Sequence, residues 1–383
     1  MKLSTDRILT THAGSLTRPD DLLDMIVARE AGKPYDQGAF ATRVRDEVAE
    51  VVRRQREAGI DVVSDGEEGK PGFFTYIDER LSGFEDRNEP ASGPRGPRFA
   101  DMADFPEYAE TALPPLVRPV CVGPIAYTGR AALQTDIDNF RAALKDVDVA
   151  EGFLPAAAPG MVSADRPNEY YKSREEMLYA TADALREEYQ GIVDAGFVLQ
   201  LDAPDVPMSW PRRMREWSKA DYLKDVELLV EVTNHSLQGI PPEMVRFHVC
   251  WGNYEAPHHY DVEVREIAPA LVKLRCGALY VEAANPRHEH EWSVWRDVKL
   301  PAGMALIAGV IDTKTNIVEH PDLVAERIVR FAGVVGRENV IAGTDCGFGT
   351  VANRRRVFPS VQWAKLKTLS EGAAIASKQL WRR

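Results

Sequence analysis

Short apolar runs alternate with charged, amphipathic stretches along most of the chain, and this alternation restricts the fold more than any other feature. The apolar runs predict strands at 7–13, 61–66, 152–158, 198–203, 245–251, 278–283, 305–311 and 339–344. Helical patterns between them cover Phe40–Glu57, Arg174–Ala195, Lys219–His235, Asp261–Leu274 and Pro321–Val335. Eight strands with intervening helices predict an α/β fold, a (β/α)8 TIM barrel.

Some stretches do not fit a minimal barrel. Residues 85–118 are rich in proline, glycine and charge, which predicts an extended excursion after the second unit. Residues 118–126 predict an extra strand outside the barrel, and residues 210–217 predict a lid or loop segment over its mouth. We therefore expect one domain, 1–383, with insertions that include a segment around 85–126.

Composition excludes several classes of function. The net charge of −12 argues against general attraction to nucleic acid or an anionic membrane. No stretch approaches the roughly 20 apolar residues that span a bilayer, and the N-terminus lacks an apolar signal core, so we expect a cytoplasmic protein. Four cysteines in 383 residues argue against a disulfide framework and leave reduced thiols for metal.

His248 and Cys250 belong to the apolar run Phe-His-Val-Cys, and a second thiol, Cys346, follows the last predicted strand. Side chains alternate along a strand, so His248 and Cys250 share one face. The C-terminal ends of parallel barrel strands meet at one mouth, where Cys346 can join them. Imidazole with two thiolates suits Zn²⁺. The alternative is that both cysteines are ordinary buried small side chains.

Polar side chains also stand at the ends of the other predicted strands. They are His12 and Ser15, Ser64 and Glu67, then Asp202, Glu282 and Asp312. A carboxylate that closes an apolar strand loses hydration unless it is paired or liganded, so several in register suggest a functional mouth. The alternative for any single one is a cap or an ion pair at a strand–helix junction.

Six motifs lie in order along the chain and cover nearly its whole length. They are His-Ala-Gly-Ser-Leu-Thr-Arg-Pro (12–19), Ser-Asp-Gly-Glu (64–67), Gln-Leu-Asp-Ala-Pro (200–204), His-Val-Cys (248–250), Val-Glu (281–282) and Thr-Asp-Cys-Gly (344–347). Together, and in this order, they resemble the C-terminal catalytic barrel of the cobalamin-independent methionine synthase family, within the uroporphyrinogen decarboxylase-like superfamily.

This resemblance implies a single-domain, zinc-dependent alkyl (methyl) transferase. It implies Zn²⁺ as cofactor, held by His248, Cys250, Glu282 and Cys346. It also implies that Ser15 binds the carboxylate of homocysteine, while Glu67 and Asp202 bind its ammonium. The small thiol would be activated as a thiolate, attack a small alkyl donor and give a thioether.

Three positions depart from the family's pattern. Ala203 follows Asp202 where the family has a second acid, and the folate-stacking tryptophan after Ala157-Ala-Pro159 is missing. The family's proton-donating histidine is replaced in Asp312-Thr-Lys314, so we assign catalytic roles to Lys314 and Asp312. These departures leave the alkyl donor open.

Two other functions remain as alternatives. One is thiol addition to an epoxide, as in epoxyalkane:coenzyme M transferase. The other is a zinc-free decarboxylase or ligand-binding barrel. His288 and His290, with His-x-His spacing, compete as metal ligands, although we expect their segment to be exposed. Cations predicted near the mouth would suit an anionic group: Arg18, Lys70, Arg166, Arg287, Lys314 and Arg354–Arg356. Whether the chain forms a homo-oligomer stays open.

Overall fold

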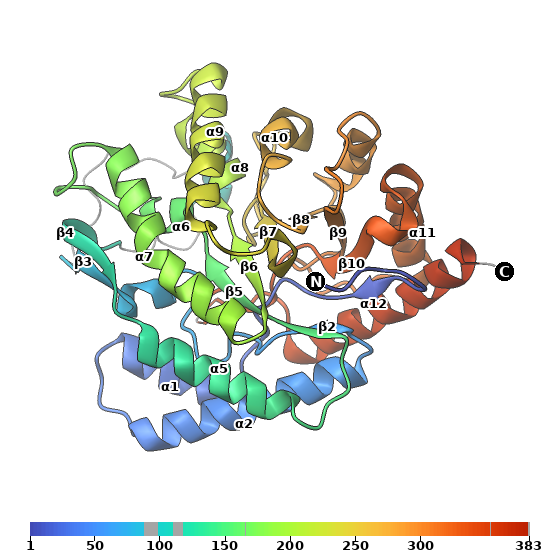
Figure 1. Cartoon of the computed structure of the whole chain (residues 1–383), viewed down its shortest axis with the longest axis horizontal. Coiled ribbons are helices and arrows are strands. Elements are labelled where there is room, and N and C mark those ends of the chain that lie inside the picture. Colours follow the sequence, from blue (N-terminus) through green and yellow to red (C-terminus); the bar gives the residue numbers. More distant parts are fainter. Residues whose placement is uncertain (88–98, 110–117, 165, 353, 382–383) are drawn as a thin grey trace.

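Parallel strands and outer helices alternate around one barrel (Figure 1). The computed structural model describes residues 1–383 except 88–98, 110–117, 165, 353 and 382–383. Eight parallel strands lie in the order β1-β10-β9-β8-β7-β6-β5-β2. Their bounds are β1 Leu9–Thr10, β2 Val62–Val63, β5 Glu151–Ala157, β6 Val198–Asp202, β7 Val245–Val249, β8 Ala278–Val281, β9 Ala305–Ile311 and β10 Val340–Thr344. The predicted TIM barrel is confirmed.

The barrel closes between its two shortest strands, β1 and β2. Asp61 N–H donates to the Thr10 carbonyl at 3.1 Å, and Thr11 Oγ1 donates to the Val62 carbonyl at 3.0 Å. The Asp61 carboxylate also accepts from Thr10 N–H at 2.9 Å and from Arg7. Side chains thus replace part of the backbone ladder, which explains why both strands are shorter than predicted.

This seam gives a prediction for stability. Asp61→Ala is expected to lower the free energy of unfolding by about 2 kcal/mol, because the part-buried Thr10 N–H loses its acceptor. Arg7→Ala removes only the half-exposed side of the same ion pair and should cost about 0.5 kcal/mol. Urea unfolding of both variants measures this difference. If both variants lose the same free energy of unfolding, the stability comes from the ion pair with Arg7 and not from the hydrogen bond between Asp61 and Thr10.

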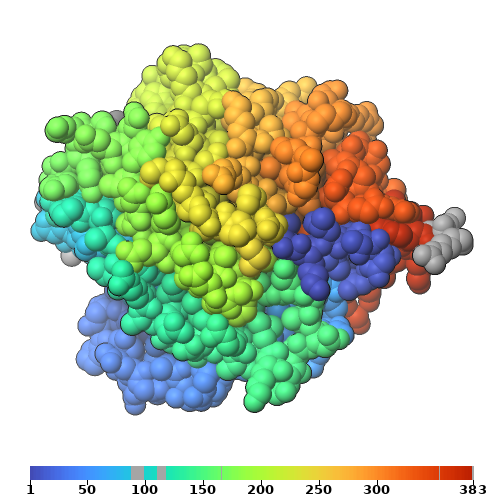
Figure 2. All heavy atoms as spheres, in the orientation of Figure 1, coloured from blue at the N-terminus to red at the C-terminus, as the bar shows by residue number. Residues whose placement is uncertain are grey.

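The N-terminal segment covers the barrel end opposite the mouth. Met1 and Leu3 pack against the interior cluster that contains Ala278, Ile307 and Ile341. The terminal ammonium donates to the Glu243 carbonyl at 2.7 Å. In Figure 2 this segment is the dark blue patch lying between the green and red-orange parts of the surface. Side chains of the N-terminal segment therefore fill the interior at this end.

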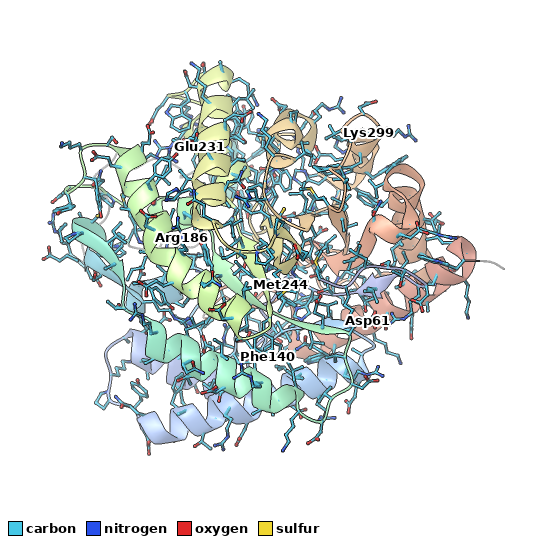
Figure 3. All side chains as sticks on the ribbon, viewed as in Figure 1. Asp61, Phe140, Arg186, Glu231, Met244 and Lys299 are labelled. Atoms are coloured by element: carbon cyan, nitrogen blue, oxygen red, sulfur yellow. The ribbon has the colours of Figure 1, made fainter. Side chains whose placement is uncertain are left out.

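Amphipathic helices form the outer layer. The longer ones are α1 Asp20–Glu30, α2 Gln37–Glu57, α5 Arg130–Leu144, α7 Arg174–Asp194, α9 Lys219–Ser236, α11 Pro321–Val335 and α12 Pro359–Leu380. Phe140 of α5 packs inward against Phe197, with ring centroids 4.8 Å apart, whereas Glu231 and Lys299 lie on the exposed surface (Figure 3). None of the helices in the described ranges is long and apolar enough to cross a membrane.

One predicted helix is shorter than expected. The pattern over Asp261–Leu274 becomes α10, Val264–Leu271, because Glu263 forms a capping box with Glu266 that fixes the first turn. The shorter helices α3 Ala100–Asp104, α4 Pro106–Ala109, α6 Pro159–Ser163 and α8 Asp205–Arg213 lie in the connections. Helix α8 takes up the first half of the predicted lid segment 210–217.

The excursion after the second unit contains an antiparallel pair outside the barrel, β3 Leu81–Glu85 with β4 Val120–Tyr127. The extra strand expected at 118–126 corresponds to β4. Residues 88–98 and 110–117 of the predicted insertion around 85–126 lie outside the described residues.

Candidate metal centre and substrate pocket

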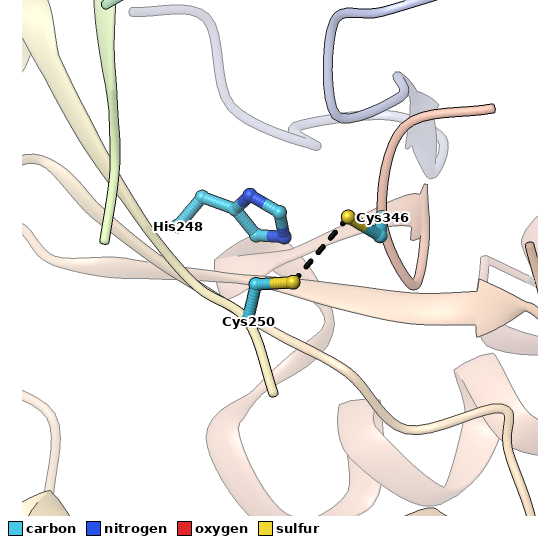
Figure 4. Close-up of side chains that lie close together, drawn as sticks. All are labelled: His248, Cys250 and Cys346. Atoms are coloured by element: carbon cyan, nitrogen blue, oxygen red, sulfur yellow. Dashed lines mark hydrogen bonds between the residues drawn. The ribbon is translucent and has the colours of Figure 1, made fainter. Parts of the chain in front are cut away.

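Two neighbouring thiols and an imidazole meet at the mouth of the barrel (Figure 4). His248 lies in β7, Cys250 follows that strand directly, and Cys346 lies two residues after β10. One ligand atom from each lies within 4.8 Å of the others, and the two Sγ atoms are 3.3 Å apart. All three residues are buried. We call them the triad. The structure brings them together as the strand pattern predicts.

His248 is oriented by Asp202, at the end of β6. Nδ1 lies 2.8 Å from Asp202 Oδ1, which also accepts from Gln200 Nε2 at 2.8 Å. The carboxylate only accepts here, so Nδ1 carries the proton and Nε2 can bind a metal. Burial lowers the pKa of His248, but the Asp202 hydrogen bond and the nearby negative groups outweigh it and raise the pKa to about 9. The surroundings of the ring favour a positive charge.

The two thiols oppose each other's ionisation when no cation is near. The hydrogen bond to Cys346, burial and the charges of Cys346 and Glu282 raise the pKa of Cys250 well above its usual range. Two thiolates in contact require a neighbouring cation to be stable. Thiolate and imidazole ligands in a buried site are the donor set that Zn²⁺ prefers. The residues present therefore fit a bound metal ion.

Glu282, at the end of β8, stands beside the triad but faces other partners. Its carboxylate accepts from Trp251 N–H at 2.9 Å, Asn285 Nδ2 at 2.8 Å and Lys314 Nζ at 2.6 Å. Burial opposes its charge, but Lys314 lowers the pKa of Glu282 below its usual value. Among the described residues, the side chains close enough together to hold a metal ion are those of the triad, and Glu282 is not one of them.

Lys314 and Asp312 lie in the connection after β9. Lys314 is buried against Glu282, and its own N–H donates to Asp312 Oδ1 at 2.9 Å. Asp312 N–H donates to Glu319 Oε1 at 2.8 Å. Neither side chain is among those that line the pocket in the described part of the chain. Their predicted catalytic roles stay predictions.

A cavity of about 390 Å³ opens beside the triad. Ser15, Glu67 and Asp202 line it together with all three triad residues, so the structure brings the predicted substrate-binding residues to the predicted metal ligands. Gly347 allows the close approach, since a Cβ there would lie 2.0 Å from Ser15 Oγ. The motif Thr-Asp-Cys-Gly thus supplies Cys346, a predicted metal ligand, and Gly347, whose missing side chain leaves room for Ser15 in the cavity wall.

Glu67 is the most unusual carboxylate of this cavity. Its backbone has φ of 57°, a left-handed conformation that costs energy for a residue other than glycine. Its Oε2 is buried without a hydrogen-bond partner. Burial and the charge of Asp202 outweigh the attraction of Lys70 and Arg18 and raise the pKa of Glu67 to about 8. The geometry suits a carboxylate that pairs with a cationic ligand group.

Aromatic and arginine side chains from several connections form the outer wall of the cavity, and most of them are not among the residues that the sequence pattern predicts at the site. The aromatic ones are Phe73, Phe74, Phe99, Tyr108 and Tyr254, and the cations are Arg118, Arg212, Arg354 and Arg356. Phe99 stacks on Tyr254 at 5.2 Å, and Arg118 lies over Phe74 at 4.1 Å. The wall offers an apolar, aromatic surface with four arginines and one carboxylate, Glu255.

Most of the cations predicted near the mouth have structural partners instead. Arg18 donates to the carbonyls of Gly349, Glu67 and Lys70, and Lys70 donates to the Pro155 carbonyl. Only Arg354 and Arg356 of that set line the cavity. The prediction that His288 is exposed is wrong: it is buried, and its ring nitrogens donate to Asp261 at 3.1 Å and to Glu291 at 2.7 Å.

The fold and this site define the class: a (β/α)8-barrel enzyme whose buried His/Cys/Cys set and adjoining cavity lie at the C-terminal ends of the strands. The catalytic domain of the cobalamin-independent synthase family matches residues 124–366. The chain belongs to this family.

Relatives of this chain are similar over nearly its whole length. A methionine synthase from Sulfolobus acidocaldarius is 26% identical over 375 residues, covering 97% of this chain and 93% of the relative. One from Thermococcus kodakarensis is 25% identical, covering 97% and 94%. The fold matches a solved B12-independent methionine synthase from a Shewanella species, in complex with selenomethionine, with a TM-score of 0.75, 21% identity and coverage of 98% and 100%.

Proposed function

We propose that this chain is a zinc-dependent methyltransferase that acts on homocysteine and forms methionine. The observation that carries the proposal is one cavity lined by the triad and by Ser15, Glu67 and Asp202. Family membership and relatives that are named methionine synthases support the same reaction. The cytoplasmic location and the oligomeric state stay predictions.

His248, Cys250 and Cys346 would hold the metal. Bound Zn²⁺ supplies a positive charge that lowers the pKa of a ligating thiol and keeps its sulfur nucleophilic. Asp202 fixes the proton of His248 on Nδ1 and so turns Nε2 toward the site. Glu282 as a fourth ligand remains a prediction drawn from the family pattern.

Ser15 would bind the carboxylate of the amino-acid thiol, and Glu67 with Asp202 would bind its ammonium. The unpartnered Oε2 of Glu67 supports this assignment, since a buried carboxylate oxygen without a donor awaits one. The aromatic wall would exclude water from the reacting sulfur and hold the donor near it. The identity of the methyl donor is left open.

Product analysis tests the proposal. Enzyme purified with its metal is mixed with homocysteine or coenzyme M, and with a methyl-folate, another methyl donor or an epoxide, and thioethers are identified by mass spectrometry. We expect methionine only where homocysteine and a methyl donor are both present. A coenzyme M thioether from an epoxide would favour the epoxide alternative. Absence of metal after purification would favour a zinc-free barrel.

Proton release on ligand binding gives a second prediction. Methionine carries the ammonium without a thiol proton, so its binding should expel up to about one proton from Glu67 below pH 8, because a cation favours the ionised carboxylate. Release should vanish as the pH rises above 8, where Glu67 is already ionised. Calorimetry in buffers of different ionisation enthalpy measures it. Unchanged proton release in Glu67→Gln would contradict the assignment.

A further inference from the structure

A second pair of polar side chains lies below the site, towards the N-terminal ends of the strands. Gln200 in β6 is the register partner of Arg246 in β7. Two residues further along, Asp202 is the partner of His248. Side chains two positions apart share one face of a strand, so both pairs face the same side of the sheet. Gln200 and Arg246 are 0% and 1% exposed and are not among the described residues that line the cavity, so they can affect a ligand only through other residues.

Arg246 fixes the direction of the Gln200 amide. Its Nε donates to Gln200 Oε1 at 2.7 Å. Its two other nitrogens donate to Thr11 Oγ1 at 2.9 Å and to the His12 carbonyl at 2.7 Å, and its Cζ lies 3.5 Å from the centroid of the Phe153 ring. A guanidinium has only donors, so the amide oxygen must face it and the amide nitrogen must point away.

Both hydrogens of the Gln200 amide nitrogen go to acceptors beside the cavity. Nε2 donates to the Ala13 carbonyl at 2.7 Å and to Asp202 Oδ1 at 2.8 Å. Asp202 Oδ1 also accepts from His248 Nδ1 at 2.8 Å, so one oxygen of this carboxylate serves both neighbours. Asp202 lines the cavity, and its Oδ2 has no hydrogen-bond donor among the described residues. The amide therefore determines which carboxylate oxygen is left for a ligand.

We propose that Gln200 is a positioning residue: it holds Asp202 so that Oδ1 orients His248 while Oδ2 is left for the substrate ammonium. This inference rests on the proposed function. The other hydrogen bond of Gln200 joins the same amide to Ala13, two residues before Ser15, so the predicted binding residues for the ammonium and the carboxylate are held at a fixed separation. Without the amide, Asp202 loses one of the two donors on Oδ1 and can rotate, so both metal and substrate are bound less tightly.

Titrations of Gln200→Met with Zn²⁺ and with homocysteine test the inference. Methionine is close to glutamine in size but has no hydrogen to donate to Asp202. We expect the affinity for Zn²⁺, and that of the metal-loaded enzyme for homocysteine, to fall about tenfold each. In Asp202→Ala, adding Gln200→Met should change the Zn²⁺ affinity by less than about twofold, because its effect passes through Asp202. A purely structural role would give an equal loss in both backgrounds.

Gln362→Met is the matched control for loss of a buried glutamine. Gln362 is 0% exposed like Gln200, but it accepts from Thr17 N–H at 2.7 Å and is not among the residues that line the cavity. Its replacement should lower the free energy of unfolding, measured in urea, and leave both affinities within about twofold of wild type.

Gln200→Glu is the second variant, for the case that Gln200→Met does not fold. A carboxylate still accepts from Arg246, which keeps the buried guanidinium paired, but it offers no hydrogen to Asp202. The added negative charge alone would tighten Zn²⁺ binding. Weaker Zn²⁺ binding therefore supports the inference, and equal or tighter binding overturns it.

The inference is also overturned if Gln200→Met keeps both affinities within about twofold of wild type, or if it costs as much affinity in Asp202→Ala as in wild type. Wild type separates this outcome from failure of the proposed function. If wild type binds Zn²⁺ and homocysteine while the variants are unaffected, only the positioning role fails. If wild type binds neither, both fail. Circular dichroism checks that each variant folds.

Discussion

Replacing Cys346 by serine is expected to remove the bound metal and to lower the rate of thioether formation by about 10³-fold. Cys346 supplies one of two thiols whose Sγ atoms are 3.3 Å apart, and a serine hydroxyl is a far weaker ligand for Zn²⁺. Among the described residues, the triad is the group of side chains close enough together to hold a metal ion. Loss of Cys346 leaves two of its three ligands, too few for a stable site. Metal content by mass spectrometry and single-turnover rates measure both effects.

Cys276→Ser is the matched control. Cys276 is also a buried free thiol, but it precedes β8 and so lies at the opposite end of the barrel from the triad. Its replacement should retain one metal per chain and the wild-type rate. If Cys346→Ser keeps its metal, Cys346 is not a ligand; if neither wild type nor the variant holds metal and their rates are equal, a zinc-free barrel becomes the better interpretation of the site.

The strand pattern predicts the triad because its geometry depends only on alternation and on the barrel's shared mouth. His248 and Cys250 are two positions apart on one strand, and Cys346 follows another strand whose end faces the same side. Contacts between side chains on different loops cannot be predicted in this way. The contact of Lys314 with Glu282 depends on how the β9 connection folds back over β8, which no local spacing encodes.

The outer wall and the last helix show the same limit. Phe99, Tyr108 and Tyr254 reach the cavity from long connections, where propensity and periodicity carry no information about direction. Helix α12 is not predicted, because Gly372, Ala373 and Ala376 on its buried side weaken the apolar period. The sequence predicts Asp202 as a substrate-binding residue. The structure shows in addition that Asp202 contacts His248 and so orients a predicted metal ligand, which the sequence pattern does not indicate.

Glu67→Gln is expected to weaken homocysteine binding by about 100-fold, because a buried carboxylate that pairs with an ammonium contributes about 2–4 kcal/mol. The substitution keeps the size and hydrogen-bonding length of the side chain while it removes the charge. A thiol without the ammonium, 4-sulfanylbutanoate, should bind wild type and variant within about threefold of each other, since it has no group for Glu67. Equilibrium titration of the metal-loaded enzyme with both thiols measures the two affinities.

Glu68→Gln is the matched control, one residue further along the same loop. Glu68 is fully buried, does not line the cavity, and has neither side-chain oxygen in a hydrogen bond. Burial raises the pKa of Glu68 well above its usual range, which favours the neutral carboxyl, and glutamine is nearly isosteric with it. Homocysteine affinity should therefore survive this change. If Glu67→Gln lowers the affinity for both thiols equally, Glu67 shapes the cavity but does not bind the ammonium group. A thiol whose only charge is a sulfonate then becomes as good a substrate candidate as homocysteine, because arginines that line the cavity can bind a sulfonate.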